Sequence, residues 1–243
     1  MAKIFTMVLA GGKGERLHPL TDQRAKPAVP FGGKYRIIDF TLSNCLNSGL
    51  RQMAVLIQYK SHSLDRHIRT GWNILNAELG EYIVSVPPQQ RISEEWYRGP
   101  ADAVYQNLFL LDNDHPEFLL VLAGDHIYKM NYADMYNLLI EKQADAVVGA
   151  IETPLADANR FGVIAVDEDR RILSFDEKPD KPMHIPGDPT QAFVSMGIYL
   201  FRTEVVREQL IRDAKEGTKH DFGKNIIPRM IKEQRVYAFK FQD

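Results

Sequence analysis

A glycine-rich segment near the N-terminus has the composition of a phosphate-binding loop. Residues 4–9 form an apolar run, and Gly11, Gly12, Gly14 and Arg16 follow it closely. Backbone N–H groups can approach a phosphate where glycine has no Cβ, and an arginine can bind the same phosphate from the side. The spacing predicts a strand that ends in a loop for a nucleotide phosphate.

This loop differs from the two common glycine motifs. A dinucleotide fingerprint needs a third glycine at the position of Leu17. A Walker loop needs Ser or Thr after Gly-Lys, whereas Gly14 follows Lys13 and Tyr35 follows Lys34. The loop on its own is therefore a weak motif, and a plain structural turn is the alternative interpretation.

Two charged residues lie where predicted strands end. The apolar residues 118–122 run into Asp125, and residues 172–175 run into Lys178 and Pro179, which cannot continue a strand. In doubly wound sheets, ligands bind beyond the carboxyl ends of the strands. A carboxylate there can hold Mg²⁺ and a lysine can neutralise a phosphate. A capping aspartate and a solvated lysine are the alternative roles.

The composition excludes several classes of protein. The 243 residues are 44% hydrophobic and 26% charged, and the net charge of −2 gives no electrostatic support for binding nucleic acid or an anionic membrane. No apolar run approaches the roughly 18 residues that a membrane span needs, and no signal peptide precedes Met7, so we expect a cytoplasmic protein. The single cysteine, Cys45, is expected to be a buried, unreactive thiol.

The distribution of apolar residues predicts an α/β fold. Strands are predicted at residues 4–9, 53–57, 118–122, 146–151 and 236–241, and helices at 37–48, 63–70, 101–111 and 132–142. This alternation indicates a Rossmann-like, doubly wound, mostly parallel sheet with helices on both faces. Residues 85–100 and 178–189 are predicted to be long loops, and no linker divides the chain.

Ordered motifs extend over nearly the whole chain, from Met7 to about Lys240. They are residues 9–17, 24–29, 36–40, 42–45, 58–62, 88–91, 96–99, 101–103, 124–128, 161–162, 177–179, 195–199 and 220–223. Together they resemble the sugar nucleotidyltransferases, specifically the ADP-glucose pyrophosphorylases (glucose-1-phosphate adenylyltransferases). The loop and Glu-Lys-Pro at 177–179 occur across that superfamily, whereas residues 24–29, 43–45 and 96–99 are specific to the ADP-glucose branch.

The resemblance implies a function and a set of site residues. The reaction is Mg²⁺-dependent transfer of adenylyl from ATP to α-D-glucose 1-phosphate, giving ADP-glucose and pyrophosphate for glycogen biosynthesis. The implied catalytic residues are Arg16, Lys26, Asp125 and Lys178, with Asp125 as the metal ligand. The implied ATP-binding residues are Gly11, Gly12, Gly14, Arg16, Lys26 and either Gln89 or Gln90. The implied glucose 1-phosphate residues are Tyr97, Gly162, Glu177, Lys178 and Ser195.

Two residues depart from the family pattern near the expected nucleotide. Glu15 replaces Ser, Thr or a basic residue, and we expect its side chain to turn away from the phosphates while its N–H serves the loop. Pro100 replaces Ser or Thr and removes a hydroxyl and an N–H. Either change could weaken ATP binding.

The resemblance also bears on domains and assembly. The family's catalytic domain continues to a second metal-binding aspartate and then to a left-handed β-helix domain, so residues 1–243 are expected to be one catalytic domain truncated before its last segment. The full-length form is expected to be an allosteric homotetramer, with effectors bound partly by basic residues near positions 23–36. The activity of the 243-residue chain alone stays open.

Two other functions compete with this interpretation. A pyrophosphorylase for UTP, dTTP or CTP is disfavoured by Gln89, Gln90 and residues 24–29. A catalytically silent regulatory subunit is disfavoured by the presence of all four implied catalytic residues, whereas Glu15, Pro100 and the expected truncation favour it. A nucleotide-preference assay would separate the first alternative from the adenylyltransferase.

Overall fold

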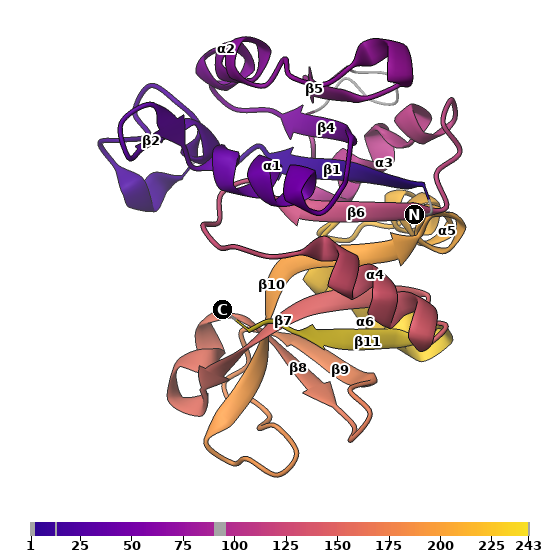
Figure 1. The fold of residues 1–243 in the computed structure, drawn as a ribbon. Helices are drawn as coiled ribbons and strands as arrows, with labels where there is room; N and C mark the ends of the chain where they lie inside the picture. Colours follow the sequence, from indigo (N-terminus) through magenta and orange to yellow (C-terminus); the bar gives the residue numbers. More distant parts are fainter. Residues whose placement is uncertain (1–2, 13, 90–95, 243) are drawn as a thin grey trace.

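A mixed nine-stranded sheet forms the centre of the computed structural model, which describes residues 3–12, 14–89 and 96–242. Its strands are β1 (Ile4–Ala10), β4 (Gln52–Ile57), β5 (Tyr82–Val86), β6 (Phe118–Ala123), β7 (Ala146–Pro154), β8 (Gly162–Val166), β9 (Ile172–Glu177), β10 (Gln191–Arg202) and β11 (Val236–Lys240). The order across the sheet is β11-β7-β10-β6-β1-β4-β5, and β8 and β9 extend from β10 (Figure 1). A separate short hairpin pairs β2 (Pro30–Phe31) with β3 (Tyr35–Arg36).

Helices cover both faces of this sheet, as the sequence predicts (Figure 1). They are α1 (Ile38–Asn47), α2 (His62–Gly71), α3 (Pro100–Gln106), α4 (Tyr132–Glu141), α5 (Thr203–Ala214) and α6 (Ile227–Glu233), the last preceded by a π-helical segment, η6 (Phe222–Ile226). Among the described residues, no helix is long and apolar enough to cross a membrane.

Alternation along β1 shows how the two apolar cores form. Phe5 and Met7 are buried against the face covered by α3, α5 and α6, whereas Ile4 and Val8 are buried against the face covered by α1, α2 and α4. A strand buried on both faces needs a nearly continuous apolar run, which is why the sequence identified it. Cys45 lies in the second core, so its predicted burial is confirmed, and this burial raises the pKa of its thiol.

The parallel half of the sheet confirms the predicted fold class. Strands β6, β1, β4 and β5 run parallel, with Val8 opposite both Leu122 and Val55, and β11 runs parallel to β7. The antiparallel strand β10, inserted between β6 and β7, was not predicted. Its polar residues and Gly197 interrupt the apolar run, and at this point the register shifts in a bulge.

Two predicted boundaries were wrong. The predicted helix at 101–111 divides at Asn107 into α3 and a 3₁₀ turn, Leu108–Leu111. The Asn107 side chain donates to the Ala103 carbonyl (2.8 Å), a local bond that competes with continuing the helix. The predicted loop at 85–100 begins too early, because residues 85 and 86 belong to edge strand β5.

Candidate active site at the carboxyl ends of the parallel strands

The neighbouring parallel strands β6, β1 and β4 end at the same edge of the sheet, so the loops that follow them lie close together. The loop after β1 supplies Gly11 and Gly12, the residue after β4 is Gln58, and Asp125 follows β6. These loops surround a cavity of about 350 Å³, a size usual for small-ligand sites. It is lined by Leu9, Gly11, Gly12, Pro27, Leu56, Gln58, Tyr97, Gly99, Pro100, Ala103, Ala123 and Asp125.

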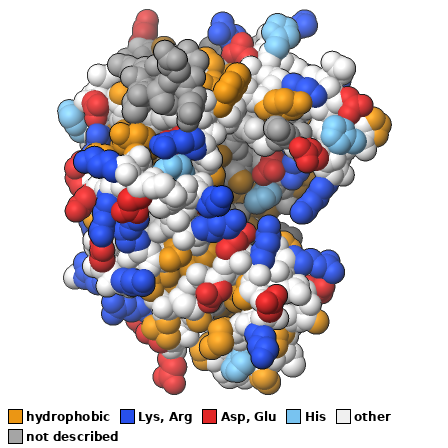
Figure 2. Space-filling view, turned by 180° about the vertical axis from the view of Figure 1, so that it is seen from behind, with side chains coloured by type: hydrophobic (Ala, Val, Ile, Leu, Met, Phe, Trp, Pro, Cys, Tyr) orange, Lys and Arg blue, Asp and Glu red, His pale blue; other side chains and the backbone are white. Residues whose placement is uncertain are grey.

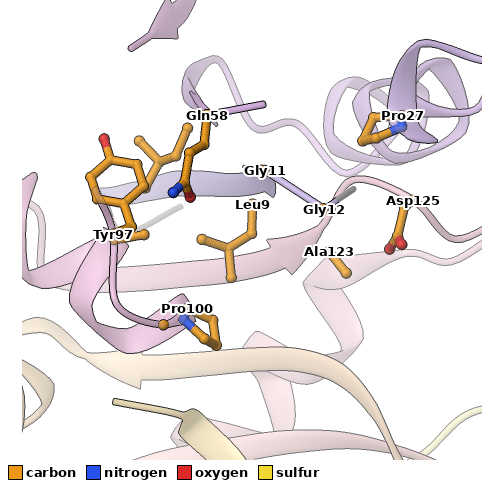
Figure 3. Close-up of a pocket in the computed structure, with 12 residues that line it drawn as sticks. Leu9, Gly11, Gly12, Pro27, Gln58, Tyr97, Pro100, Ala123 and Asp125 are labelled. Carbon is orange, nitrogen blue, oxygen red and sulfur yellow. The ribbon is translucent and has the colours of Figure 1, made fainter. Parts of the chain in front are cut away.

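The cavity has two chemically different ends. Figure 3 shows Tyr97, Gln58 and Pro100 at one end and Asp125 with Pro27 at the other, with the loop glycines between them. The first end offers an aromatic ring and an amide, and the second a carboxylate. An elongated ligand with a flat ring at one end and phosphates at the other matches this division.

A second hollow of about 530 Å³ adjoins the carboxylate end. It is lined by Gly14, Glu15, Arg16, Leu17, Lys26 and Asp125, so Asp125 belongs to both spaces. The molecular surface is recessed between the two halves of the molecule on one face, with basic and acidic side chains at the rim (Figure 2). The structure therefore gathers the loop glycines with Arg16, Lys26 and Asp125. Glu15 lines this hollow and is exposed; the expected direction of its side chain stays a prediction.

Gly14 is the loop position where any other residue would be strained. Its φ is 68°, and a Cβ would lie 2.8 Å from Thr21 Cγ2 and 2.9 Å from Lys26 Cβ. Its carbonyl accepts hydrogen bonds from the Leu17 N–H and the Thr21 hydroxyl, both at 2.9 Å. The turn that presents Arg16 and the position of Lys26 therefore depend on this glycine.

The two central charges of the site pair with each other. Lys26 Nζ lies 3.0 Å from Asp125 Oδ2, and both side chains are about 30% exposed, at 29% and 30%. His126 Nε2 lies 3.5 Å from the other Asp125 oxygen. The sequence predicted a role for each of Lys26 and Asp125, but nothing in it predicted their direct contact.

Four residues expected to bind the sugar phosphate lie on the β8–β9–β10 part of the sheet. Gly162 pairs with Glu177 across β8 and β9, and the Lys178 N–H donates to the Phe161 carbonyl (2.9 Å). Lys178 is exposed, with its Nζ 3.8 Å from a Glu177 oxygen. Ser195 begins the bulge of β10.

The β10 bulge connects these residues with Asp125. Tyr199 pairs with Val121 in antiparallel register, so the residues before Tyr199 lie beside the end of β6. A Cβ on Gly197 would lie 4.0 Å from His126 Cε1, which shows that the bulge reaches the loop carrying Asp125. The bulge that begins at Ser195 therefore lies beside the loop of Asp125. Gly162, Glu177, Lys178 and Ser195 line neither of the two hollows described above.

Other predicted residues are placed differently. Tyr97 lines the cavity with Gly11 rather than lying on β8–β10; its hydroxyl accepts from Asn107 Nδ2 (2.9 Å), and burial raises its pKa. Gln89 is exposed, donates to the Pro87 carbonyl (3.0 Å) and lines neither hollow. Gln90 lies outside the described residues, and the expectation that one of the two glutamines binds adenine stays a prediction.

Gln58 is a cavity residue to which the sequence analysis gave no role. It directly follows a buried parallel strand, the same signal that singled out Asp125. A Cβ on Gly11 would lie 3.2 Å from Gln58 Cβ, so this side chain packs directly against the glycine loop. Applied to every strand, the strand-end rule would have found it.

The Tyr97–Pro100 wall of the cavity is held by a buried carboxylate in α3. Asp102 is 2% exposed and accepts hydrogen bonds from the Arg98 N–H, an Arg98 guanidinium nitrogen and Gln106 Nε2, each at 2.9 Å. Pro100 occupies the first turn of α3, where a missing N–H costs little. Burial alone would raise the pKa of Asp102, but the Arg98 and Gln106 hydrogen bonds outweigh it and lower that pKa.

This lowered pKa predicts a pH-dependent contribution to stability. Asp102 is more acidic in the folded than in the unfolded chain, so its carboxylate stabilises the fold above the unfolded pKa of about 4 and loses this effect as pH falls through the folded pKa. We expect Asp102→Asn to lower the free energy of unfolding by about 1–3 kcal/mol at pH 7. Urea unfolding at pH 7, 5 and 3.5 should show this difference shrinking in acid, and a constant difference would contradict it.

Comparison with known proteins decides the family. A family model described as Nucleotidyl transferase matches residues 5–243. The chain belongs to that family. It is 56% identical over 242 residues to glucose-1-phosphate adenylyltransferase 2 of Vibrio vulnificus (strain YJ016), covering 99% of this chain and 60% of the relative. It is 55% identical over 240 residues to glucose-1-phosphate adenylyltransferase of Methylococcus capsulatus, covering 98% of this chain and 57% of the relative.

A third relative shows the same pattern of coverage. The chain is 53% identical over 245 residues to glucose-1-phosphate adenylyltransferase of Rhodopirellula baltica, covering 100% of this chain and 55% of the relative. The chain thus spans 55–60% of the length of these curated relatives. The family and the fold follow from these matches.

Proposed function

We propose that this chain carries the site at which ATP and glucose 1-phosphate combine to give ADP-glucose and pyrophosphate. The observation that supports this best is the meeting of the glycine loop, Arg16, Lys26 and Asp125 at the carboxyl ends of β1 and β6. The relatives, named for this reaction, align with almost the whole chain.

The nucleotide would lie along the cavity with its base at the Tyr97 end. The ring of Tyr97 and the amide of Gln58 can pack on and hydrogen-bond to a base, whereas Gly11, Gly12 and Gly14 leave backbone N–H groups accessible to phosphates. Gln89 or Gln90 completes the base contacts in this proposal. Arg16 and Lys26 supply positive charge to the triphosphate beyond the loop.

Glucose 1-phosphate would lie against β8–β10, beside the Asp125 loop. Lys178 binds its phosphate, and Glu177, Gly162 and Ser195 contact or shape the space for the sugar hydroxyls. Tyr97 lies on the nucleotide side of the cavity, so a sugar contact from Tyr97 requires the sugar to reach toward that wall.

The residues present fit a magnesium ion at Asp125. Mg²⁺ is usually held by one or two carboxylates together with substrate phosphates, and Asp125 places one carboxylate in the hollow that the phosphate loop lines. When bound, Mg²⁺ supplies positive charge that stabilises the charge developing on the phosphates. The Asp125 carboxylate is paired with Lys26 in the free chain, and Lys26 can turn to the phosphates when that pair separates.

The reaction needs no protein nucleophile. An oxygen of the glucose 1-phosphate attacks the α-phosphorus of ATP, the new P–O bond forms as the bond to the β-phosphate bridging oxygen breaks, and pyrophosphate leaves with that electron pair. Because both substrates are anions, the barrier consists largely of repulsion and alignment. Arg16, Lys26 and Lys178 reduce the repulsion, and the rigid strand ends fix the alignment.

Nucleotide selectivity tests this proposal. Pyrophosphate release should be measured with Mg²⁺, glucose 1-phosphate and each of ATP, UTP, dTTP and CTP, alongside ATP binding by calorimetry. We expect ATP to be bound and used in preference to the others. Preferential use of UTP, dTTP or CTP would replace adenylyl transfer with another nucleotidyl transfer, and failure to bind any nucleotide would contradict the site itself.

Lys178 provides a test of the sugar-phosphate side. Lys178→Ala removes a charge-assisted contact to the phosphate, so we expect the KM for glucose 1-phosphate to rise about 10- to 100-fold while the KM for ATP changes little. Lys181→Ala, an exposed lysine of the same loop, is the matched control. Steady-state kinetics with an unchanged KM for glucose 1-phosphate would remove Lys178 from this role.

A further inference from the structure

A buried polar cluster lies between the end of α5 and η6. His220 Nδ1 and Asp213 Oδ2 are 2.8 Å apart, and their side chains are only 4% and 2% exposed. The Thr218 hydroxyl donates to the other Asp213 oxygen (2.8 Å). Neither His220 nor Asp213 lines the cavities of the candidate site, so the cluster has no direct part in the chemistry proposed above.

The cluster holds the backbone of His220 in an unusual conformation. The φ of His220 is 49°, in the left-handed region that a non-glycine residue occupies only at a cost of about 1–2 kcal/mol. The His220 N–H donates to Thr218 Oγ1 (3.0 Å), while the imidazole is held by Asp213. Thr218 therefore fixes the backbone N–H of His220, and Asp213 fixes its imidazole.

This conformation directs two backbone carbonyls at a wall of the cavity. The His220 carbonyl accepts a hydrogen bond from the Ala101 N–H (2.8 Å). This is the first N–H of α3, because the helix begins at Pro100, which has none. A Cβ on Gly99 would lie 2.4 Å from the His220 carbonyl oxygen and 2.5 Å from that of Lys219, so the Gly99 backbone rests directly on these carbonyls. Gly99 and Pro100 are the residues that line the cavity beside Tyr97.

The same segment also reaches the sugar side. Asp221 is the N-cap of η6, and its carboxylate accepts a hydrogen bond from the Lys224 N–H (3.0 Å). A Cβ on Gly223 would lie 2.8 Å from Phe175 Cε1 and 3.4 Å from Glu177 Oε2. Residues 213–223 therefore contact the nucleotide-side wall at Gly99 and the strand that carries Glu177.

We propose that His220 is a positioning residue. Through its hydrogen bonds to Asp213 and Thr218, it fixes the position of the Gly99–Pro100 wall relative to the bound nucleotide. The ligand is taken as ATP on the basis of the proposed function. The Ala101–His220 and Gly99–His220 contacts tie His220 to the wall whichever ligand occupies the cavity. A displacement of this wall by about 1 Å can change binding or rate by up to about a hundredfold.

The test compares His220→Ala with His220→Asn. Alanine removes the imidazole and tolerates a positive φ poorly, whereas asparagine places an N–H near the position of Nδ1 and accepts a positive φ readily. We expect His220→Ala to speed hydrogen exchange of the Ala101 amide and to weaken ATP binding, each by about tenfold or more. His220→Asn should restore both to within about threefold.

Two controls separate positioning from general destabilisation. His115→Ala removes another histidine with positive φ (42°), exposed and in a different loop. Val206→Ala leaves a cavity in the core beneath the same helix, α5. Val206 lies seven residues before Asp213, and its replacement removes none of the cluster's hydrogen bonds. At matched thermal stability, both should keep the wild-type Kd for ATP.

The outcomes are distinct. An unchanged Ala101 exchange rate and ATP affinity in His220→Ala would overturn the proposal, as would an equal loss of affinity in Val206→Ala. If His220→Ala does not fold, Thr218→Val provides the same comparison, because it removes the three hydrogen bonds of the Thr218 hydroxyl and keeps the His220–Asp213 pair. If the unaltered chain does not bind ATP, the proposed function fails, and the exchange rate of the Ala101 amide still tests the wall.

Discussion

Replacing Asp125 by asparagine is expected to reduce turnover by about a thousandfold while leaving the fold intact. Asparagine has nearly the same shape but no negative charge, so it would hold a divalent cation poorly. The hollow beside the glycine loop has two carboxylates among its lining residues, Asp125 and Glu15, and Asp125 is the one shared with the adjoining cavity. The loss should appear in kcat at saturating magnesium, because charge stabilisation matters most in the transition state.

The control for this substitution is a second Lys–Asp pair outside the site. Asp169 pairs with Lys142 Nζ at 2.5 Å on the surface, so Asp169→Asn removes the same charge from a similar pair. We expect that variant to keep wild-type turnover. Near-normal kcat in Asp125→Asn, with circular dichroism showing an intact fold, would remove Asp125 from metal binding.

The sequence predicted the parts of the fold that have continuous apolar runs. Strand β1 and strand β6 are buried on both faces, so their residues are almost all apolar and their boundaries agree with prediction to one residue. Strand β10 escaped prediction because Ser195 and Gly197 interrupt its apolar run at the bulge. The antiparallel pairings it makes are long-range contacts that no local pattern encodes.

In the candidate site, too, local features could be predicted from the sequence and long-range contacts could not. Asp125 and the loop glycines could be predicted because each follows a strand, and position after a strand is a local property of the sequence. The contact of His220 with Gly99 joins residues more than a hundred positions apart and depends on the register of α3 against the α5–η6 turn. The Lys26–Asp125 pair is of the same kind, with 99 positions between its partners.

That pair leads to the second large expected effect. In the free chain, Lys26 Nζ neutralises the carboxylate that we propose as the metal ligand, and both side chains are partly buried. We therefore expect Lys26→Gln to lower turnover and to raise the affinity for a divalent cation. It should lower kcat by about 100- to 1000-fold, because a cation facing the phosphates is lost. It should also raise the affinity of the nucleotide-free chain for a divalent cation, by up to about fivefold, because Asp125 no longer has a competing partner.

Electron paramagnetic resonance with Mn²⁺ measures the second effect independently of catalysis, and steady-state kinetics measures the first. Lys142→Gln, which breaks the surface pair with Asp169, should change neither. In the double variant with Asp125→Asn, the loss of Lys26 should no longer raise Mn²⁺ affinity, since the two side chains act on the same site. A Lys26→Gln variant that binds Mn²⁺ more weakly than the unaltered chain would show that Lys26 supports the carboxylate rather than competing for it. A variant with unchanged kcat would show that Lys26 does not face the phosphates during turnover.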